Sequence, residues 1–336
     1  MDKEKRTDEI SPAAAVVGST GGGKSALAMA LCERHGGELV SVDSMQVYRT
    51  MDIGTAKPTK EEQARVRHHM IDVCAPDTPY SAADYAPAAL AAAREIRARG
   101  NLPVFCGGTG LYLDSVLRGG APGETASDAA VRKRLQAELA ADGAHALHER
   151  LRAVDAESAD AIHENNTRRV IRALEVFEVS GKPKSVWDRE SRAVPPAVAL
   201  VTMGLFYHDR DLLYKRIDRR VDEMLRAGLL DETERLWRAG VFEKNTTAAA
   251  AIGYKELLGV LTGEESLADA AARLKTATRR YAKRQITWFS AKPYVLPLYC
   301  DGEDGTPKPL SALAAEAEAL LREGGVLLGE AGVVHA

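Results

Sequence analysis

A glycine-rich run with the residues needed to hold phosphate lies near the start of this 336-residue chain. Residues 18–25 read GSTGGGKS and match the pattern G-x-x-x-x-G-K-[ST]. In such loops the backbone N–H groups surround phosphate oxygens, the lysine adds a positive charge and the serine hydroxyl can bind Mg²⁺. The amino end of the following helix adds a partial positive charge. We therefore expect a diphosphate or polyphosphate, with Mg²⁺ on the serine, at Gly18, Thr20, Gly21, Gly22, Gly23, Lys24 and Ser25.

Asp43 is the candidate acid–base group. It follows the apolar residues 39–42, and a carboxylate at the carboxyl end of a strand lies where open α/β sheets bind their ligands. There Asp43 can hold Mg²⁺ or act as a general base, whereas the alternative is a cap for the turn at Ser44. Usual ATPases and kinases carry an acid after a later strand, but residues 104–106 lead into GGT without one. Phosphate is therefore expected as a leaving group rather than as the point of attack.

A basic segment near the carboxyl end of the chain favours nucleic acid as a partner. Residues 270–300 contain no acidic residue, although the whole chain has a formal net charge of −3. A solvated basic face is the alternative, but the missing acidic partners and the following Trp288 and Phe289 favour a phosphate backbone with aromatic contacts. Helical spacing places the polar groups of Arg280, Lys283, Arg284 and Gln285 near one side. The expected RNA-binding residues are these four, Arg279, and a smaller cluster of Arg168, Arg169 and Arg172.

These groups need a scaffold, and the first part of the chain predicts one. Apolar runs alternate with helical patterns there, and the runs TKEE at 59–62 and SAAD at 81–84 resemble the capping boxes that open helices. Alternating strands and helices predict an α/β fold with a parallel sheet covered by helices. The expected strands are residues 13–17, 39–42 and 103–106.

The pattern changes after the glycine-rich residues 119–123. Residues 127–181 look wholly helical and highly charged, and residues 197–201 return to a strand pattern. The domain organisation that we expect is a catalytic core with RNA-contacting helices at residues 1–121 and 197–300, a helical insertion domain at 122–196, and a tail of no assigned role at 301–336.

Composition excludes several classes of protein. With 45% apolar residues the chain can bury a full core, and it has neither a signal-peptide segment nor an apolar run of the ~20 residues that span a bilayer. His68 and His69 have no third metal ligand at suitable spacing and are expected to be structural. A disulfide framework or structural zinc site is not expected from the four scattered cysteines, Cys32, Cys74, Cys106 and Cys300. We expect a cytoplasmic protein without a membrane partner, and the oligomeric state stays open, a monomer included.

Eight short motifs follow one another along the chain. They are G-x-T-x-x-GKS at 18–25, DSMQVYR at 43–49, DIGTAKP at 52–58, HHMID at 68–72, GGTGLY at 107–112, R-x-x-RALE at 169–175, IGYKE at 252–256 and TRRYAKRQ-x-TW at 278–288. In this order they resemble the motifs of the bacterial tRNA dimethylallyltransferases, a family of P-loop-related prenyltransferases. The resemblance covers nearly the whole chain before the tail, and eight motifs in sequence make it specific.

The resemblance implies transfer of a dimethylallyl group from dimethylallyl diphosphate to N6 of the adenosine just 3′ of the anticodon, in tRNAs that read codons beginning with U. The implied partners are this diphosphate and the tRNA anticodon stem-loop, with Mg²⁺ as cofactor. Lys24, the loop amides and Mg²⁺ on Ser25 would stabilise the leaving diphosphate. Asp43 would orient the amine and take its proton. The resemblance also implies tRNA contacts for Asp43, Ser44, Met45, Gln46 and Thr109. It places Thr109 among the catalytic residues as well, and it implies a diphosphate contact for Arg216 or Arg220.

The chain departs from the family pattern at two places. The family loop reads Gly-Pro-Thr-Ala where this chain has GSTG at 18–21, and the extra glycine is expected to loosen the loop slightly without removing a phosphate ligand. HENN at 163–166 stands where the family has His-Pro-Asn-Asp, which puts the role of a carboxylate at Asn166 in doubt. The cysteines of the eukaryotic zinc finger are absent, so the bacterial form fits.

Two other functions stay open at this point. A P-loop kinase for a small metabolite would need ATP and a hydroxyl acceptor, and it leaves the basic segment unexplained. A non-catalytic RNA-binding protein with a nucleotide switch is the other. ATP turnover without tRNA would favour the kinase, whereas tight tRNA binding with no product would favour the binding protein.

Overall fold

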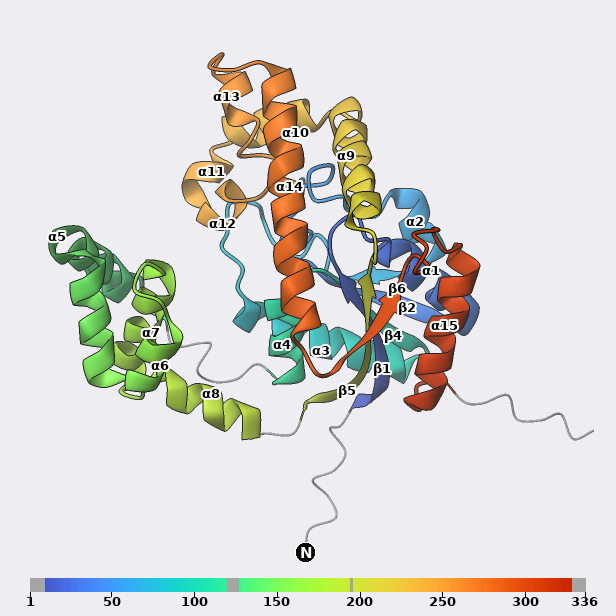
Figure 1. Cartoon of the computed structure of the whole chain (residues 1–336), viewed down its shortest axis with the longest axis horizontal. Helices are drawn as coiled ribbons and strands as arrows, with labels where there is room; N and C mark the ends of the chain where they lie inside the picture. Colours follow the sequence, from blue (N-terminus) through green and yellow to red (C-terminus); the bar gives the residue numbers. More distant parts are fainter. Residues whose placement is uncertain (1–9, 120–126, 194–195, 328–336) are drawn as a thin grey trace, which may run out of the picture. The chain divides into compact units, whose positions relative to one another are not determined.

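The computed structural model describes residues 10–119, 127–193 and 196–327, in which six parallel strands form one sheet (Figure 1). The strands are β1 (Ile10–Gly18), β2 (Gly37–Val42), β3 (His68–His69), β4 (Leu102–Gly107), β5 (Val198–Phe206) and β6 (Val295–Tyr299). Their order across the sheet is β3-β2-β4-β1-β5-β6. The predicted α/β fold is confirmed; the short strand β3 and the edge strand β6 were not anticipated.

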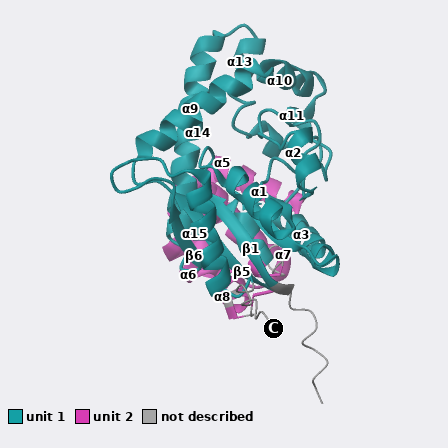
Figure 2. Ribbon diagram, turned by 90° about the vertical axis from the view of Figure 1, so that its right-hand side faces the viewer, with its two compact units in different colours: residues 1–116, 198–336 teal, residues 117–197 magenta. Residues whose placement is uncertain are grey.

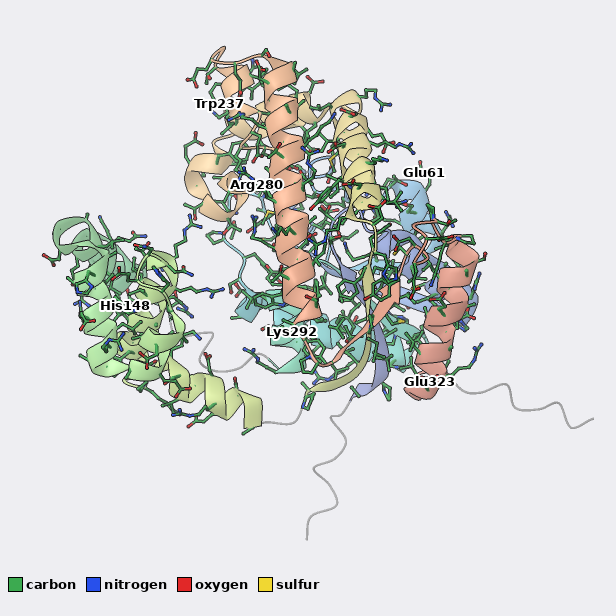
Figure 3. All side chains as sticks on the ribbon, in the orientation of Figure 1. Glu61, His148, Trp237, Arg280, Lys292 and Glu323 are labelled. Atoms are coloured by element: carbon green, nitrogen blue, oxygen red, sulfur yellow. The ribbon has the colours of Figure 1, made fainter. Side chains whose placement is uncertain are left out.

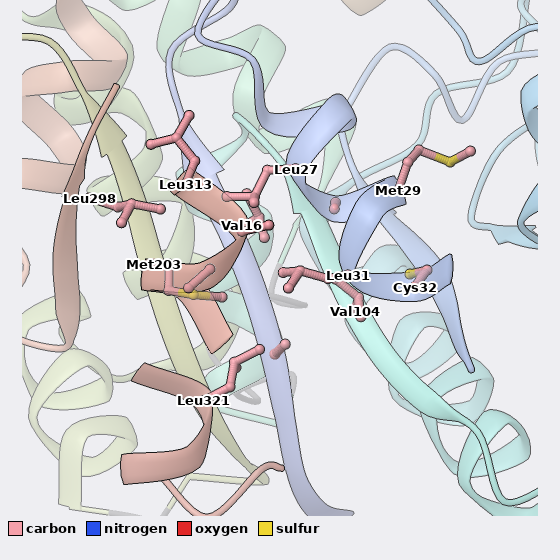
Figure 4. Close-up of a cluster of buried hydrophobic side chains, with 14 of the residues drawn as sticks. Val16, Leu27, Met29, Leu31, Cys32, Val104, Met203, Leu298, Leu313 and Leu321 are labelled. Carbon is pink, nitrogen blue, oxygen red and sulfur yellow. The ribbon is translucent and has the colours of Figure 1, made fainter. Parts of the chain in front are cut away.

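One face of the sheet is covered by α1 (Lys24–His35) and α15 (Leu310–Glu323). Successive side chains of a strand point to opposite faces, so Ala14 and Val16 of β1 face these helices. They pack in a buried cluster with Leu27 and Leu31 of α1 and Leu321 of α15 (Figure 4). Each fully buried leucine of this kind contributes about 1.5–3 kcal/mol. Part of the segment 301–336 therefore belongs to the core of the sheet.

The other helices around the sheet are α2 (Lys60–Arg65), α3 (Ala82–Ala98), α4 (Gly110–Leu117) and α14 (Leu267–Ser290). α3 contacts β1, β2 and β4, and α14 contacts β1, β5 and β6. Both predicted capping boxes are confirmed, because Thr59 caps α2 and Ser81 caps α3 through reciprocal bonds to Glu62 and Asp84.

A group of helices continues from β5 toward the carboxyl end of the chain and includes α14 (Figure 1). Its other members are α9 (Arg210–Arg226), α10 (Leu229–Arg238), α11 (Val241–Lys244), α12 (Thr246–Ala249) and α13 (Leu258–Leu261). Leu213 and Ile217 of α9 pack against Ala282 of α14. This contact holds two basic helices side by side.

The chain divides into two compact units, residues 1–116 with 198–336 and residues 117–197 (Figure 2). The second unit overlaps the expected insertion at 122–196 and consists of α5 (Ala129–Val154), α6 (Ala156–Ala161), α7 (Thr167–Ser180) and α8 (Lys184–Ala193). Leu135, Leu151 and Leu174 build its own buried core. Among the described residues, no helix has both the length and the apolar character that a membrane span needs.

Candidate active site

Three candidate segments meet at the carboxyl edge of the sheet. β4 lies between β1 and β2, and each of these strands leads into one segment. Residues 18–25, called the phosphate loop below, follow β1; residues 107–109, called the GGT turn, follow β4; and Asp43 follows β2. Parallel strands end at the same edge, so the topology brings the phosphate loop and the carboxylate together. The N–H of Thr109 donates to Val42 O at 3.1 Å, which ties the GGT turn to the end of β2.

The backbone of the phosphate loop adopts positive φ values at glycines just before α1 begins. Gly21 and Gly23 have φ values of 73° and 95°, which glycine adopts at little cost. α1 begins at Lys24, so its first N–H groups point toward the loop. The Lys24 ammonium donates to Ser19 O at 2.7 Å, and burial lowers the pKa of Lys24 to about 8. A half-buried lysine that forms no ion pair with any described residue, beside the first N–H groups of a helix, is a site for an anion.

α9 forms a basic wall beside the phosphate loop. Arg216 Nε donates to Gly21 O at 2.9 Å. Burial lowers the pKa of Arg220, and the nearby Asp43 carboxylate opposes this shift. The structure thus brings both candidate arginines to the loop. Gly21 permits this approach, because a β-carbon there would lie 2.8 Å from Ile217 Cγ1.

Asp43 uses its two carboxylate oxygens differently. Oδ1 accepts bonds from the N–H groups of Met45 at 2.8 Å and Gln46 at 3.3 Å, which is the capping role considered above. Among the described residues, Oδ2 has no hydrogen-bond partner. Asp43 is only half-buried and lies close enough to Lys24 to raise the pKa of that lysine. One oxygen therefore fixes the carboxylate while the other remains available to a ligand.

Thr109 sits beside Asp43 across the strand ends. Its hydroxyl oxygen accepts a bond from the Ser44 N–H at 3.0 Å and lies 3.4 Å from the Ser44 hydroxyl. Burial raises the pKa of Tyr281 to about 12, and the Asp43 carboxylate acts in the same direction. The structure therefore gathers Asp43, Ser44 and Thr109 with a tyrosine from α14.

A buried carboxylate that sequence reasoning missed supports this region. Glu232 of α10 is 2% exposed and accepts bonds from the N–H groups of Asp52, Ile53 and Gly54 at 3.0–3.1 Å. The Tyr254 hydroxyl also donates to Glu232, at 2.8 Å. Tyr254 lies in one of the eight motifs and Gly54 in another, so those motifs offered a signal. For Glu232 the sequence offered no signal, because its local pattern does not differ from that of other acidic residues on a charged helix.

Gln46 uses its amide to hold the same loop. Its Nε2 donates to Thr55 O at 3.2 Å and Ala56 O at 3.1 Å, and its Oε1 accepts from the Ser41 hydroxyl at 2.8 Å. These bonds give Gln46 a supporting position behind Asp43. Its expected tRNA contact stays a prediction, as do those of Ser44 and Met45.

Metal-binding groups are sparse in the described part of the chain, where no group of three or more His, Cys, Asp or Glu side chains could hold a metal ion. His69 Nε2 lies 2.6 Å from Glu38 Oε2, and His68 Nδ1 lies 2.7 Å from Val66 O. These contacts agree with a structural role for the two histidines. Mg²⁺ needs less from the protein, because it commonly binds one or two side-chain oxygens plus substrate phosphates and water. The Ser25 hydroxyl at the start of α1 fits that requirement.

The basic segment 270–300 divides into paired and unpaired charges. Its lack of acidic residues does not leave it unpaired, because acids from elsewhere in the chain neutralise four of its basic groups. The pairs are Arg273–Glu265, Lys275–Asp222, Arg279–Asp218 and Lys292–Asp114. Among the described residues, Arg280, Lys283 and Arg284 form no ion pair, and all three are exposed on α14. Figure 3 labels Arg280 on this helix. The unpaired charge is therefore concentrated at these three positions.

Gln285 does not share the exposed side that helical spacing suggested for it. It is 6% exposed, and its amide contacts the phosphate loop and the GGT turn. Each helical residue turns the side chain by about 100°, so one position past Arg284 already faces inward. In this structure the Gln285 amide is buried, so it is not exposed for the tRNA contact that we expected.

The smaller arginine cluster lies on α7 in the second unit. Arg168 and Arg169 are exposed, whereas Arg172 pairs with the fully buried Glu175 at 3.0 Å. Burial raises the pKa of Glu175, but bonds from Arg172, Asp128 N–H and Arg132 outweigh it and hold that pKa below the usual value. Asn166 is the N-cap of α7, without a side-chain capping bond.

Comparison with known proteins places the chain in a family. The family model described as IPP transferase matches residues 46–292. The tRNA dimethylallyltransferase of Acetivibrio thermocellus is 45% identical over 274 residues, which cover 82% of this chain and 87% of the relative. That of Geobacillus thermodenitrificans is 46% identical over 275 residues, covering 82% and 86%.

Solved structures agree with these relatives. The tRNA isopentenylpyrophosphate transferase of Bacillus halodurans is 40% identical with a TM-score of 0.65, and the match covers 94% of this chain and 98% of that chain. A eukaryotic dimethylallyltransferase acting on tRNA is 29% identical with a TM-score of 0.73, over 86% of this chain and 74% of that chain. Sequence and structure together show that the chain belongs to the IPP transferase family.

Proposed function

We propose that this protein transfers a dimethylallyl group from dimethylallyl diphosphate to N6 of the adenosine 3′-adjacent to the anticodon, in tRNAs that read codons beginning with U, and releases diphosphate. The observation that carries the proposal is the meeting of the phosphate loop, the free Asp43 oxygen and the unpaired basic face of α14 in one unit. We expect this activity in the cytoplasm, where tRNA substrates are available.

The donor half of the site stabilises a leaving group. The C–O bond between the allylic carbon and the diphosphate breaks, and negative charge grows on the diphosphate oxygens. The Lys24 ammonium, the amides at the start of α1 and the guanidinium groups of Arg216 and Arg220 surround the position of that charge. Preorganised donors of this kind commonly contribute more to catalysis than any other single effect. Mg²⁺ held by Ser25 and the diphosphate would neutralise part of the same charge.

The acceptor half of the site activates the adenine amine, which is a poor nucleophile. The exocyclic nitrogen of adenine shares its lone pair with the ring, so it needs a base that orients it and removes its proton as the N–C bond forms. The free oxygen of Asp43 receives that proton, while Oδ1 stays fixed by its two backbone bonds. The adenine leaves the base stack to reach this pocket. Thr109 and Ser44 lie beside Asp43 and contact the base in this proposal.

Donor affinity should fall above pH 8. The Lys24 ammonium has a pKa of about 8, so below that pH it is charged and binds the diphosphate. Above it, Lys24 must first take up a proton, so we expect the dissociation constant to rise by up to about tenfold per pH unit between pH 8 and 9. Burial raises the pKa values of the neighbouring Cys106 and Cys300 to about 11, so these thiols do not titrate in this range.

Calorimetry with the unreactive dimethylallyl thiodiphosphate, in the presence of an anticodon stem-loop, measures this dependence. Phosphate groups complete their ionisation near pH 6, so the ligand charge is constant in the window. Lys24→Met should bind more weakly and without the pH dependence. An equal slope in the wild type and in Lys24→Met would assign the effect to another group.

Replacing Arg280, Lys283 and Arg284 with alanine should weaken tRNA binding and flatten its salt dependence. The slope of log K against log salt should become shallower by up to about one unit for each phosphate that these side chains neutralise. Filter binding across a salt series measures both quantities. Arg94→Ala is the control, because Arg94 lies on α3, whose carboxyl end is at the opposite edge of the sheet. Unchanged affinity and slope in the triple variant would show that this face of α14 does not bind tRNA.

The transfer itself is tested with purified protein, dimethylallyl diphosphate, Mg²⁺ and unmodified tRNA. Mass spectrometry of the digested tRNA should find N6-dimethylallyladenosine next to the anticodon, with one diphosphate released per modified base. An anticodon stem-loop that carries guanosine at the target position should remain unmodified. Diphosphate release without modified tRNA, or ATP turnover in its place, would contradict the proposal.

A further inference from the structure

One side chain of α14 connects the donor and acceptor halves of the site. Gln285 Oε1 accepts a bond from the Thr20 N–H of the phosphate loop at 2.9 Å. Its Nε2 donates to Gly108 O of the GGT turn, also at 2.9 Å. Gly108 allows this contact, because a β-carbon at that position would overlap the Gln285 amide. A single buried amide therefore bridges two loops that follow neighbouring strands.

The two bridged loops hold the two reactants. Thr20 belongs to the loop that surrounds the diphosphate, and Gly108 is next to Thr109, whose hydroxyl holds the Ser44 N–H beside Asp43. Bond formation requires the allylic carbon and the attacking nitrogen to approach within about 3–3.5 Å in the correct orientation. Their separation depends on the separation of the two loops. Backbone pairing of β1 with β4 places the starts of the two loops, and the Gln285 bridge adds a side-chain contact between them.

Contacts before and after Gln285 anchor α14 firmly enough for this residue to hold the two loops in place. Trp288, one turn after Gln285, packs so closely on Gly110 that a β-carbon there would overlap the indole. Lys292, labelled in Figure 3, lies just past the end of the helix and pairs with Asp114 of α4 at 2.6 Å. Tyr281, one turn before Gln285, lies near Thr109 and Gln285, and both polar groups oppose the rise that burial causes in the pKa of its phenol. Contacts that precede and follow Gln285 along α14 thus fix the position of its amide.

We propose that Gln285 is a positioning residue that sets the distance and orientation between the donor and the acceptor amine, rather than a tRNA-binding residue. The inference rests on the proposed function, because it needs two reactants held by these two loops. Loss of the bridge should slow the transfer step and leave the affinity for tRNA nearly unchanged. Its effect is therefore opposite to that of the exposed arginines and lysine on the same helix.

The test compares Gln285→Met and Gln285→Glu in single-turnover transfer with both substrates saturating. Methionine fills the space without either bond. Glutamate accepts from the Thr20 N–H, but an ionised carboxylate cannot donate to Gly108 O. We expect the rate to fall about 10- to 100-fold in both variants, with less than a twofold change in the dissociation constant of tRNA. If the methionine variant does not fold, the polar glutamate variant still answers the question.

A stability control separates positioning from simple loss of structure. Asn101 donates to Glu38 Oε1 at 2.7 Å at the amino edge of the sheet, so Asn101→Leu removes a comparable amide bond far from the reaction. This variant should lower the melting temperature and keep the transfer rate of the wild type. A wild-type rate in the Gln285 variants would overturn the proposal, as would weaker tRNA binding with a normal transfer step. Absence of transfer by the wild-type protein would instead refute the proposed function.

Discussion

Asp43→Asn should lower the rate of prenyl transfer about 10²–10⁴-fold with little change in affinity for either substrate. Asparagine has the same shape and keeps an acceptor for the N–H groups of Met45 and Gln46, so the turn stays capped. What it loses is basicity, and with it the acceptor for the proton that leaves the adenine amine. Single-turnover transfer at saturating donor and tRNA measures this step directly. Lys24 and α14, to which we assign the binding of the two substrates, are unaltered.

The geometry of Asp43 makes this experiment decisive between its two roles. If Asp43 only caps the turn, asparagine should serve as well and the rate should stay normal, and the proton would then leave to water or diphosphate. Asp128 provides a matched control, because its Oδ1 also accepts from two backbone N–H groups, those of Ala130 at 2.7 Å and Val131 at 3.2 Å. Asp128→Asn should leave the transfer rate unchanged.

Lys24→Ala should reduce donor binding and the transfer step together, lowering kcat/KM for the donor by about 10³-fold or more. In the proposed mechanism its ammonium, which lies in the phosphate loop, stabilises the charge of the bound diphosphate and also the charge that grows when the C–O bond breaks. Loss of one preorganised donor at such a position costs about 10²–10³ in the chemical step, and the weaker ground-state binding adds to that cost. Affinity for tRNA should not change.

Separate measurement of the donor dissociation constant and the single-turnover rate distinguishes the two contributions. Lys215→Ala is the control, because this exposed lysine on α9 carries the same charge one residue before Arg216. A variant at Lys24 that weakens donor binding but transfers at the normal rate under saturation would show that Lys24 binds both states equally. A normal kcat/KM would exclude Lys24 from the site.

Together these variants divide the site by function. Asp43 and Gln285 should affect the transfer step, Lys24 should affect binding and transfer, and the exposed face of α14 should affect tRNA binding. We assign two of these roles to opposite sides of α14, because Gln285 is buried against the loops whereas Arg280, Lys283 and Arg284 face solvent.

Local sequence was enough to predict the main elements around the candidate site and to identify its candidate reactive groups. The phosphate loop needs glycines, a lysine and a serine at fixed spacing, and all of them lie within eight consecutive residues, so no distant partner is required to recognise it. The capping boxes at Thr59 and Ser81 are equally local. Asp43 was recognisable because strand ends in a parallel sheet share one edge, which follows from the strand–helix alternation alone.

The tertiary structure alone decided which charges are free and which polar groups support the site. Arg279 and Lys275 looked unpaired because their partners, Asp218 and Asp222, lie more than 50 residues away along the chain. Gln285 looked like part of a basic face, but the approach of α14 to the strand ends buries it between Thr20 and Gly108. Sequence patterns reflect only the neighbours that a residue has along the chain. Pairing and burial depend on groups that only the fold brings together, and electrostatic and hydrogen-bond energies depend on those distances in space.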